Sequence, residues 1–425
     1  MIKLYNLFPL LAGQFNHWGN HIERAAAMGF DWIFVNPVQK PGKSGSLYSI
    51  ADYFQLNPKL VNRRSLKTPN AQLKAAIRSA EKHHGVRMMT DLVINHCAID
   101  SNLVIQHPEW FASDQHGNVE HPYCLEDDGS KVVWNDLARF DHQNTTDPEG
   151  LYRYYISILE HFISLGFSGF RCDAAYQIPA SLWQRIINNI KTRYPDIVFI
   201  AETLGCTEQQ SKQTAQAGFD YIFNSSKWWD FSSPWLLDQY HQFRETVVPS
   251  ISFPESHDTE RLFLESGQNI DVLKQRYLFS AVFSAGVMMP MGYEFGFKKA
   301  LNVVHTSPDD WEATDVDLTD FIKQVNSFKS DYKVFQEDGP IQIISHGDQP
   351  ILFLWKASNC KQQEALIVIN KDPWNKQHFF TDDLYQYLQS NKPLKDLSLE
   401  YPLDYLPTPY EFGLNPGMAR VMVAA

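Results

Sequence analysis

Eight short runs of apolar and β-branched residues alternate with longer amphipathic patterns over about the first 300 residues of the chain. The runs begin at Ile2, Asp31, Val86, Phe167, Ile197, Phe219, Ser250 and Gly286. Between them lie stretches such as NAQLKAAIRSAEKHH and LYRYYISILEHFISLG, in which apolar residues recur every three or four positions. Short strands that alternate with helices are typical of parallel βαβ units, and eight such strands close a barrel. The sequence therefore predicts a (β/α)8 TIM barrel.

Two regions depart from this alternation. Residues 97–149, after the third strand, lack a long helical pattern, and a connection of this length is usually functional. From about residue 336 the chain turns to short segments such as PIQIISHG, ILFLWKA and ALIVINK, which are typical of a small antiparallel β domain. We therefore predict a catalytic barrel over residues 1–96 and 150–335, an insert over 97–149, and a C-terminal β domain over 336–425.

Composition excludes some classes of binding partner and favours one cellular compartment. The net charge of −12 disfavours nucleic acid and an anionic membrane surface, since both reward a basic patch. No segment reaches the ~20 apolar residues of a membrane span, and the apolar run LYNLFPLLAG is interrupted by Pro9 and fits a first barrel strand better than a secretion signal. The cysteines show no C-x-x-C spacing, which favours a reducing, cytoplasmic location and no zinc site; they are Cys97, Cys124, Cys172, Cys206 and Cys360. The sequence does not indicate an oligomeric state.

Charged and polar residues gather at the ends of the predicted strands, where the chemistry of a barrel protein sits. Burying a pair such as Arg171 and Asp173 costs several kcal/mol unless each charge is compensated. Taken singly, a residue such as His96 has an ordinary structural role, and Glu202 fits a helix cap. Acids that converge from three different strands instead predict a catalytic site. The strand-end residues are Asp91, Asn95, His96, Arg171, Asp173, Glu202, Glu255, His257 and Asp258.

Four of these strand ends carry a recognisable pattern. The segments DLVINH, GFRCDAA, FIAET and FPESHD resemble, in order, the four sequence signatures of the α-amylase family, glycoside hydrolase family 13. The segment GSLYSIADYFQLNP resembles the family's element after strand two, and WNDLARFD is similar to its fifth signature in the insert. The resemblance covers about residues 1–335.

The resemblance implies a retaining glycoside hydrolase that cleaves α-1,4-glucosidic bonds of an α-glucan or maltooligosaccharide through a covalent glycosyl-enzyme. It makes Asp173 the nucleophile, Glu202 the acid and base, and Asp258 a third carboxylate that grips sugar hydroxyls. Retention predicts that the two reacting carboxyl groups lie about 5 to 5.5 Å apart. We expect Arg171 to favour the ionised form of Asp173, and a drier pocket to keep Glu202 protonated at the same pH.

The resemblance also implies roles around the sugar. Tyr48 would stack on the ring, His96 and His257 would bind hydroxyls, and Asp91 would steady Arg171. Asp52 would be structural. Aromatic residues of the insert and the later loops are candidate platforms for further glucose units, although tryptophan more often packs in a core. These candidates are Trp134, Trp228, Trp229, Trp235 and Trp311, with Trp228 and Trp229 of KWWDF the best placed.

The sequence also departs from the family. Tyr176 and Gln177 stand where many members carry Lys-His on the leaving-group side, so acceptor preference is open. The segments HPEWF, RYPDIVFIAET and AGFDYIF resemble the branch that moves maltose from maltose 1-phosphate onto α-glucan, which makes transglycosylation or maltosyl transfer the alternative function. A non-catalytic carbohydrate-binding protein on the same scaffold is a third reading, and the retained acids argue against it.

No cofactor is required for this chemistry. Many members join the insert to the barrel through calcium, which prefers oxygen ligands. Here such a site would need Asn95, whose role is otherwise structural, together with insert carboxylates such as Asp136 or Asp141.

Overall fold

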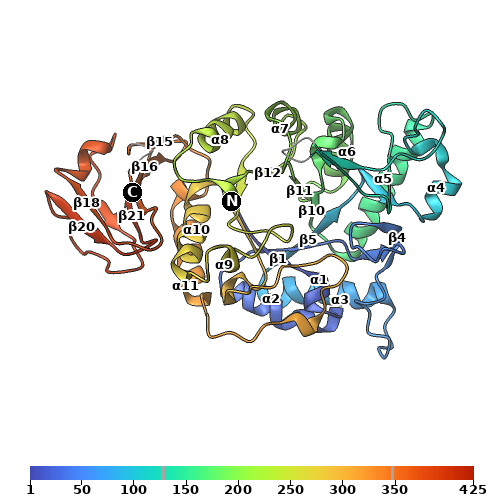
Figure 1. The fold of residues 1–425 in the computed structure, drawn as a ribbon, viewed down its shortest axis with the longest axis horizontal. Coiled ribbons are helices and arrows are strands. Elements are labelled where there is room, and N and C mark those ends of the chain that lie inside the picture. Colours follow the sequence, from blue (N-terminus) through green and yellow to red (C-terminus); the bar gives the residue numbers. More distant parts are fainter. Residues whose placement is uncertain (126–129, 346–348) are drawn as a thin grey trace.

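The computed structural model describes residues 1–125, 130–345 and 349–425. Within these residues, eight parallel strands close a barrel at the centre of the molecule (Figure 1). Each predicted run supplies one strand, so the predicted (β/α)8 barrel is confirmed. The barrel strands are β1 (Ile2–Leu7), β2 (Trp32–Val35), β5 (Arg87–Leu92), β10 (Gly169–Cys172), β11 (Val198–Ala201), β12 (Tyr221–Phe223), β13 (Ser250–Ser252) and β14 (Gly286–Pro290).

The strands follow one another around the barrel in chain order, and β14 pairs with β1 to close it. The register places Arg171 of β10 opposite Asp91 of β5 on one side and Ile200 of β11 on the other. Because the strands are parallel, the segments that follow β5, β10, β11 and β13 all emerge at one rim. That rim receives the polar residues on which the functional prediction depends.

Helices cover the outside of the barrel, and their ends follow from local sequence. Helix α3 begins after Thr68, whose hydroxyl accepts from the amide of Ala71, and it ends at Gly85 in the left-handed conformation. Helix α5 begins and ends in the same way with Asp147 and Gly166. The longer helices are α2 (Trp18–Ala27), α3 (Pro69–His84), α5 (Pro148–Leu165), α6 (Ala180–Arg193), α7 (Glu208–Ala215), α8 (Trp235–Glu245), α10 (Ile270–Phe283) and α11 (Thr319–Asp331).

The loops after β2 and β5 contain short antiparallel hairpins at the same rim. After β2, β3 (Gln39–Pro41) pairs with β4 (Ile50–Leu56). In the segment after β5, β6 (His96–Ala98) pairs with β9 (Leu137–Arg139), and β7 (Tyr123–Leu125) pairs with β8 (Lys131–Val133). A short helix, α4 (Asn102–Gln106), lies between β6 and β7 in sequence. Figure 1 shows this segment, in teal, at the end of the molecule opposite the C-terminal strands.

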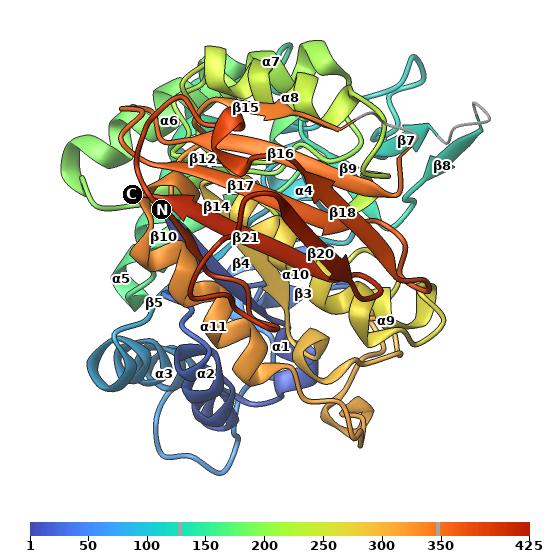
Figure 2. The same ribbon diagram turned by 90° about the vertical axis from the view of Figure 1, so that its left-hand side faces the viewer.

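The C-terminal strands form an antiparallel domain, as the sequence predicts. Figure 2 shows them in front of the barrel, with α10 and α11 behind. Along β16, Leu352 and Leu354 join the main core, while Phe353 and Trp355 join a second core on the outer side. This alternation follows from the two-residue period of a strand. One sheet has the order β15 (Ile341–Ile343), β16 (Ile351–Ala357), β17 (Glu364–Asn370), β21 (Ala419–Ala424) and β19 (Leu394–Asp396), and a ribbon pairs β18 (Gln377–Thr381) with β20 (Tyr410–Leu414).

Two further findings concern the described part of the chain. Among the residues that the structure describes, no helix is both long enough and apolar enough to span a membrane. The cysteines whose side chains are described are free thiols, namely Cys97, Cys172, Cys206 and Cys360, and the side chain of Cys124 lies outside the described part.

Candidate active site

Arg171 is the centre of the polar cluster at the barrel rim. Its Nη1 atom donates to Asp173 Oδ1 at 2.6 Å and to Asp91 Oδ1 at 2.8 Å, and its Nη2 lies 3.8 Å from Glu202 Oε2. The guanidinium is buried, and so is the carboxylate of Asp91. One buried cation therefore faces three carboxyl groups, which supplies the compensation that these charges need.

Glu202 and Asp173 stand in different environments. Burial raises the pKa of Glu202 to about 7, and the charge of Asp173 acts in the same direction while Arg171 opposes it. Asp173 is only partly buried and holds its short ion pair with Arg171. Glu202 can therefore be protonated near neutral pH while Asp173 keeps a cation at its side, which is the division of roles expected from the sequence.

Backbone amides of the turns after β10 and β11 bind the carboxyl group of Glu202. Ala174, directly after Asp173, has a φ of 41°, which is uncommon for a residue with a side chain. Its amide donates to Glu202 Oε2 at 2.8 Å, and the amide of Leu204 donates to Oε1 at 2.5 Å. Both oxygens of Glu202 are thus held in place, and backbone strain of this kind concentrates at functional sites.

Tyr48 joins the β2 loop to this cluster. Its hydroxyl donates to Asp91 Oδ2 at 2.6 Å and accepts from Nδ2 of Asn36 at 3.0 Å. Nε2 of His257 lies 2.7 Å from the same oxygen, and the two rings are parallel with centroids 5.7 Å apart. Because the hydroxyl proton goes to Asp91, we infer that His257 carries its proton on Nε2.

The two histidines and Asp258 complete the rim. Burial lowers the pKa of both His96 and His257, so both rings are neutral. Nε2 of His96 lies 3.1 Å from the backbone oxygen of Tyr48, and Nε2 of His257 lies 3.0 Å from Oδ2 of the exposed Asp258. The Nδ1 atoms of both rings are buried without a hydrogen-bond partner, which leaves each ring one unused polar atom.

Tyr176 and Gln177 lie in a short turn after β10, η3 (Ala175–Gln177), and line a cavity of about 1060 Å³. The opposite wall comes from the insert, with Glu120, His121 and Arg139 among its residues. Burial raises the pKa of Tyr176 to about 12, and Gln177 Oε1 accepts from Nδ2 of Asn95 at 3.4 Å. The pair that departs from the family pattern thus faces a large cavity three residues beyond Asp173.

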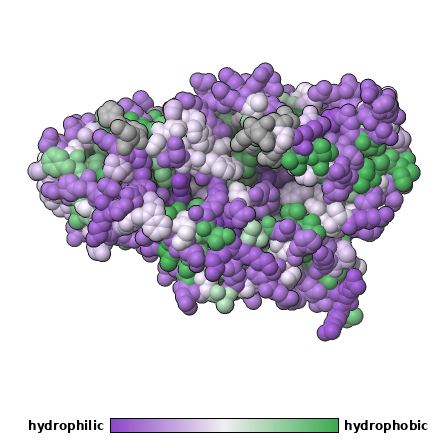
Figure 3. Space-filling view, in the orientation of Figure 1, coloured by the Kyte–Doolittle hydropathy of each residue, from purple (hydrophilic) through white to green (hydrophobic). Residues whose placement is uncertain are grey.

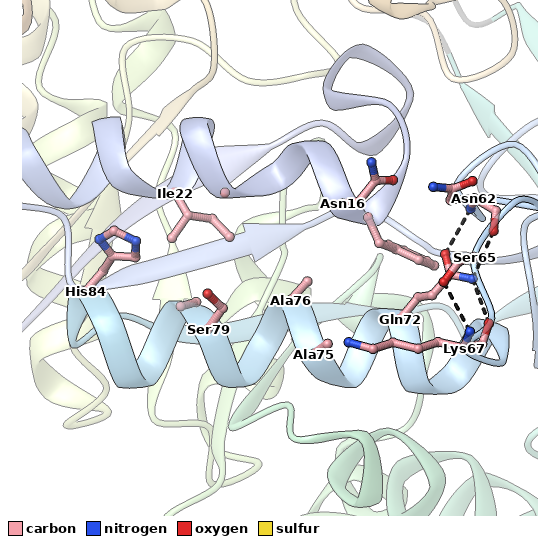
Figure 4. A pocket seen from close by; sticks show the side chains of 13 residues that line it. Asn16, Ile22, Asn62, Ser65, Lys67, Gln72, Ala75, Ala76, Ser79 and His84 are labelled. Atoms are coloured by element: carbon pink, nitrogen blue, oxygen red, sulfur yellow. Dashed lines mark hydrogen bonds between the residues drawn. The ribbon is translucent and has the colours of Figure 1, made fainter.

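A second hollow, of about 310 Å³, lies between α2 and α3 on the outside of the barrel (Figure 4). Its lining includes Asn16, Ile22, Lys67 and Ala76, and it holds no carboxylate. None of the predicted site residues lines it, so the catalytic prediction does not concern this hollow.

The structure corrects one of the predicted tryptophan platforms. Trp229 is fully buried, and its ring packs against Phe231, Phe279 and Phe283 with centroids 5.2 to 6.2 Å apart. It is a core residue, because the chain after η4 (Ser226–Trp228) turns this side chain inward. Trp228 remains exposed at 52%.

The other aromatic candidates divide in the same way. Trp134 and Trp235 are exposed. Trp311 packs beside the guanidinium of Arg24, 5.0 Å from the ring centroid, and against Phe297. Its contacts are those of a packing residue.

Asp52 and Asn95 lie beside the site. Oδ1 of Asp52 accepts from the amides of Phe54 and Gln55 within β4, a structural contact. Oδ1 of Asn95 is buried and accepts no hydrogen bond. Asp141, proposed as its calcium partner, caps the amides of its own turn. Across the described ranges, no three His, Cys, Asp or Glu side chains are grouped as a metal site.

Sequence reasoning missed three members of the cluster and one structural role. Asn36 binds the hydroxyl of Tyr48 and is itself bound by Nδ2 of Asn6, and both asparagines stand at strand ends, where the rule used for the other residues would have found them. Phe34 lies beside His257 and Arg171. Glu255, in contrast, pairs with the buried Arg261 at 2.7 Å and is structural.

The fold and the site together define a class of protein. A parallel (β/α)8 barrel presents three acids, a buried arginine and two neutral histidines at one rim, and this set fits carboxylate-based chemistry on glycosides. Comparison with known proteins shows which enzymes this chain resembles.

A family model described as the glucanotransferase domain of glycogen debranching enzyme matches residues 1–117. An α-1,4-glucan:maltose-1-phosphate maltosyltransferase of Burkholderia pseudomallei is 25% identical over 87% of this chain and 33% of its own length. A cyclomaltodextrinase of Geobacillus thermopakistaniensis is 21% identical over 83% of this chain and 61% of its own length. The chain thus spans from one third to about three fifths of these curated relatives.

The fold is also that of a solved structure. An α-amylase of Geobacillus thermoleovorans superposes with a TM-score of 0.77 at 18% identity, covering 99% of this chain and 98% of that one. The sequence of this chain is therefore similar to those of a maltosyltransferase and a cyclomaltodextrinase, and its fold is that of an α-amylase.

Proposed function

We propose that this protein is a retaining enzyme that cleaves α-1,4-glucosidic bonds of α-glucans or maltooligosaccharides. The observation that carries the proposal is the pair of unlike carboxyl groups around Arg171. Asp173 forms a 2.6 Å ion pair with the guanidinium, whereas Glu202 is buried and has its pKa raised to about 7. Glycoside cleavage needs one carboxylate as nucleophile and one carboxylic acid as proton donor.

In the first step the proton of Glu202 passes to the glycosidic oxygen as its bond to the anomeric carbon breaks. Asp173 attacks that carbon and forms a covalent glycosyl-enzyme of inverted configuration. Arg171 and the neutral His257 would stabilise the charge that moves through the site. The Nδ1 atoms of His96 and His257 are buried without a partner, so each ring would reach a sugar hydroxyl there only after a small rotation of the side chain.

In the second step Glu202, now a carboxylate, takes a proton from the incoming hydroxyl. Water as the acceptor gives hydrolysis, whereas a sugar hydroxyl gives transfer. Attack on the glycosyl-enzyme inverts the anomeric carbon again, so the product keeps the α configuration. The backbone amides of Ala174 and Leu204 favour the ionised form of Glu202 at this stage.

The test is product analysis on maltohexaose. We expect new reducing ends, and proton NMR should show that the first product is the α anomer. No change in linear maltooligosaccharides, in branched glucan or in maltose 1-phosphate with glucan would contradict the proposal.

Transfer is the second candidate, because several relatives have transferase names and the Lys-His pair is replaced. Tyr176 and Gln177, with the insert, wall a cavity that can hold a sugar acceptor. In the same assay, a transferase would redistribute chain lengths while the number of reducing ends stays constant, or would lengthen glucan with maltose 1-phosphate.

We also propose that calcium can bind at Asn95, because its buried Oδ1 lacks a partner and oxygen ligands suit this ion. The chemistry itself needs no metal. The test is thermal unfolding with EDTA, which should lower the melting temperature unless calcium is restored.

A cytoplasmic location is proposed from the free thiols of Cys97 and Cys172, and cell fractionation tests it.

A further inference from the structure

Trp374, in the loop between β17 and β18 of the C-terminal domain, is one of the most exposed tryptophans in the described part of the chain, at 64% exposure. Tryptophan is enriched at interfaces, because its ring offers a large apolar surface and its N–H a polar contact. Neither the catalytic cluster nor the core of the C-terminal domain uses it.

The loop that carries Trp374 is held by hydrogen bonds. Oδ1 of Asp372 accepts from the amides of Trp374 and Asn375 at 2.8 and 3.0 Å. The carbonyl of Asp372 accepts from the amide of Gly417, and the carbonyl of Asn375 accepts from Nδ2 of Asn370. The indole is therefore presented on an ordered turn, and a ligand that binds it need not order the loop first.

This loop rests on the barrel. Nδ2 of Asn269 donates to the carbonyl of Pro373 at 2.7 Å, and Nζ of Lys371 donates to Ser232 Oγ at 3.2 Å. A Cβ atom built on Gly267 would lie 3.8 Å from Cη2 of Trp374, so the indole edge lies over Gly267. Trp374 thus belongs to the C-terminal domain but stands beside the loops that follow β12 and β13.

These loops lead back toward the proposed active site. The short helix α9 (Leu262–Glu265) follows Asp258 by four residues, and Glu265 forms an ion pair with Lys227, the neighbour of Trp228. Leu264 of α9 is exposed at 49%. Figure 3 shows hydrophobic side chains gathered over α9 on this face. We name the exposed residues Trp228, Leu264 and Trp374 the α9 strip.

We propose that the α9 strip binds an α-1,4-glucan chain outside the catalytic cleft, with Trp374 as its remote platform. The inference rests on the proposed function for the identity of the ligand. Pyranose rings present flat faces of C–H groups that pack on an indole, while their hydroxyls need polar neighbours. The partly or fully exposed side chains beside the strip supply them, namely Glu265, Asn269 and Asp372.

The α9 strip leads from the barrel rim to the C-terminal domain. The strip begins at Trp228, at the end of the η4 turn that follows β12, and it continues across α9 to the C-terminal domain. A polymer that enters the cleft can therefore extend along it. The strip thus predicts a preference for long chains.

The experiment is affinity electrophoresis of the full-length protein in native gels with and without glycogen, which measures binding without turnover. We expect glycogen to retard the wild type, and we expect Trp374→Ala to weaken the binding about tenfold, from the loss of one buried ring face. Trp374→Phe, which keeps a ring, should restore part of the retardation. Tyr405→Ala removes another exposed aromatic of the same domain, 76% exposed, and should migrate like the wild type.

Kinetics give a second readout. For Trp374→Ala, the ratio of KM for soluble starch to KM for maltotetraose should rise about tenfold relative to the wild type. Equal retardation of Trp374→Ala and the wild type would overturn the inference, and so would a wild type that glycogen does not retard. A change in sedimentation from dimer to monomer in Trp374→Ala would also overturn it, because the strip would then be a contact between two copies. Retardation that depends on Trp374 in a protein without turnover would keep the binding site and remove the proposed catalysis.

Discussion

Arg171→Met tests the electrostatic arrangement of the site. The substitution keeps an unbranched side chain but removes the cation that faces Asp91, Asp173 and Glu202 at 2.8, 2.6 and 3.8 Å. Removing one partner of a buried ion pair costs about 3 to 5 kcal/mol, because the other charge is left without compensation. With an unfolding entropy of about 2.1 cal/mol/K per residue, this loss lowers the melting temperature of a chain of this length by about 3 to 6 °C.

The loss should depend on pH in a defined direction. Burial already raises the pKa of Asp91 and of Glu202 to about 7, so each group destabilises the fold as pH rises from its unfolded pKa toward 7. Without Arg171 both pKa values rise further, and the destabilisation continues above pH 7. At pH 8, one unit above, this adds about 1.4 kcal/mol for each carboxyl group, whereas at pH 5 both are largely neutral in either protein.

The assay is thermal unfolding of wild type and variant at pH 5 and pH 8. The control is Arg185→Met, which breaks an exposed ion pair with Glu149 at 2.7 Å and should cost less than about 1 kcal/mol at either pH. An Arg171→Met variant that loses the same stability at both pH values, or no more than the control, would refute the argument.

Three further predictions follow from the site. Asp173→Asn should reduce turnover by at least about a thousandfold while far-ultraviolet circular dichroism stays unchanged, and retained turnover would remove Asp173 as nucleophile. Because Glu202 must be protonated to act as the acid and its pKa is about 7, kcat/KM should fall about tenfold per pH unit above 7, and a flat profile to pH 9 would contradict this role. Trp229→Ala should lower the unfolding free energy by about 3 to 5 kcal/mol and Trp228→Ala by less than about 1, since the first is buried and the second is exposed; equal losses in denaturant titrations would contradict this assignment.

The barrel could be predicted because its signals are local. Each strand is a short buried run between helices with clear caps, such as Thr68 and Gly85 around α3. The β3–β4 hairpin gave no such signal, because Lys40 and Gln55 are exposed and the alternation there is weak. Its pairing depends on contacts that form only when the barrel rim brings the loops together.

Site residues could be predicted where the chemical type of a residue and its position at a strand end agree. They could not be predicted where side-chain packing decides which way a residue faces. Arg171, Asp173 and Glu202 meet because parallel strands end at one rim. Trp228 and Trp229 are neighbours in sequence, yet one faces solvent and the other the core, and local sequence does not distinguish them. Glu255 resembled a site acid until the fold placed Arg261 beside it.

The most direct test of the proposed chemistry is capture of the covalent intermediate. The protein is incubated with a fluorinated glucosyl fluoride that forms a slowly hydrolysed glycosyl-enzyme, digested with pepsin, and mapped by mass spectrometry. The account predicts one glucosyl adduct on the peptide that contains Asp173, and no adduct in Asp173→Asn. An adduct on another residue, or full activity against maltohexaose without any adduct, would contradict a retaining mechanism through Asp173.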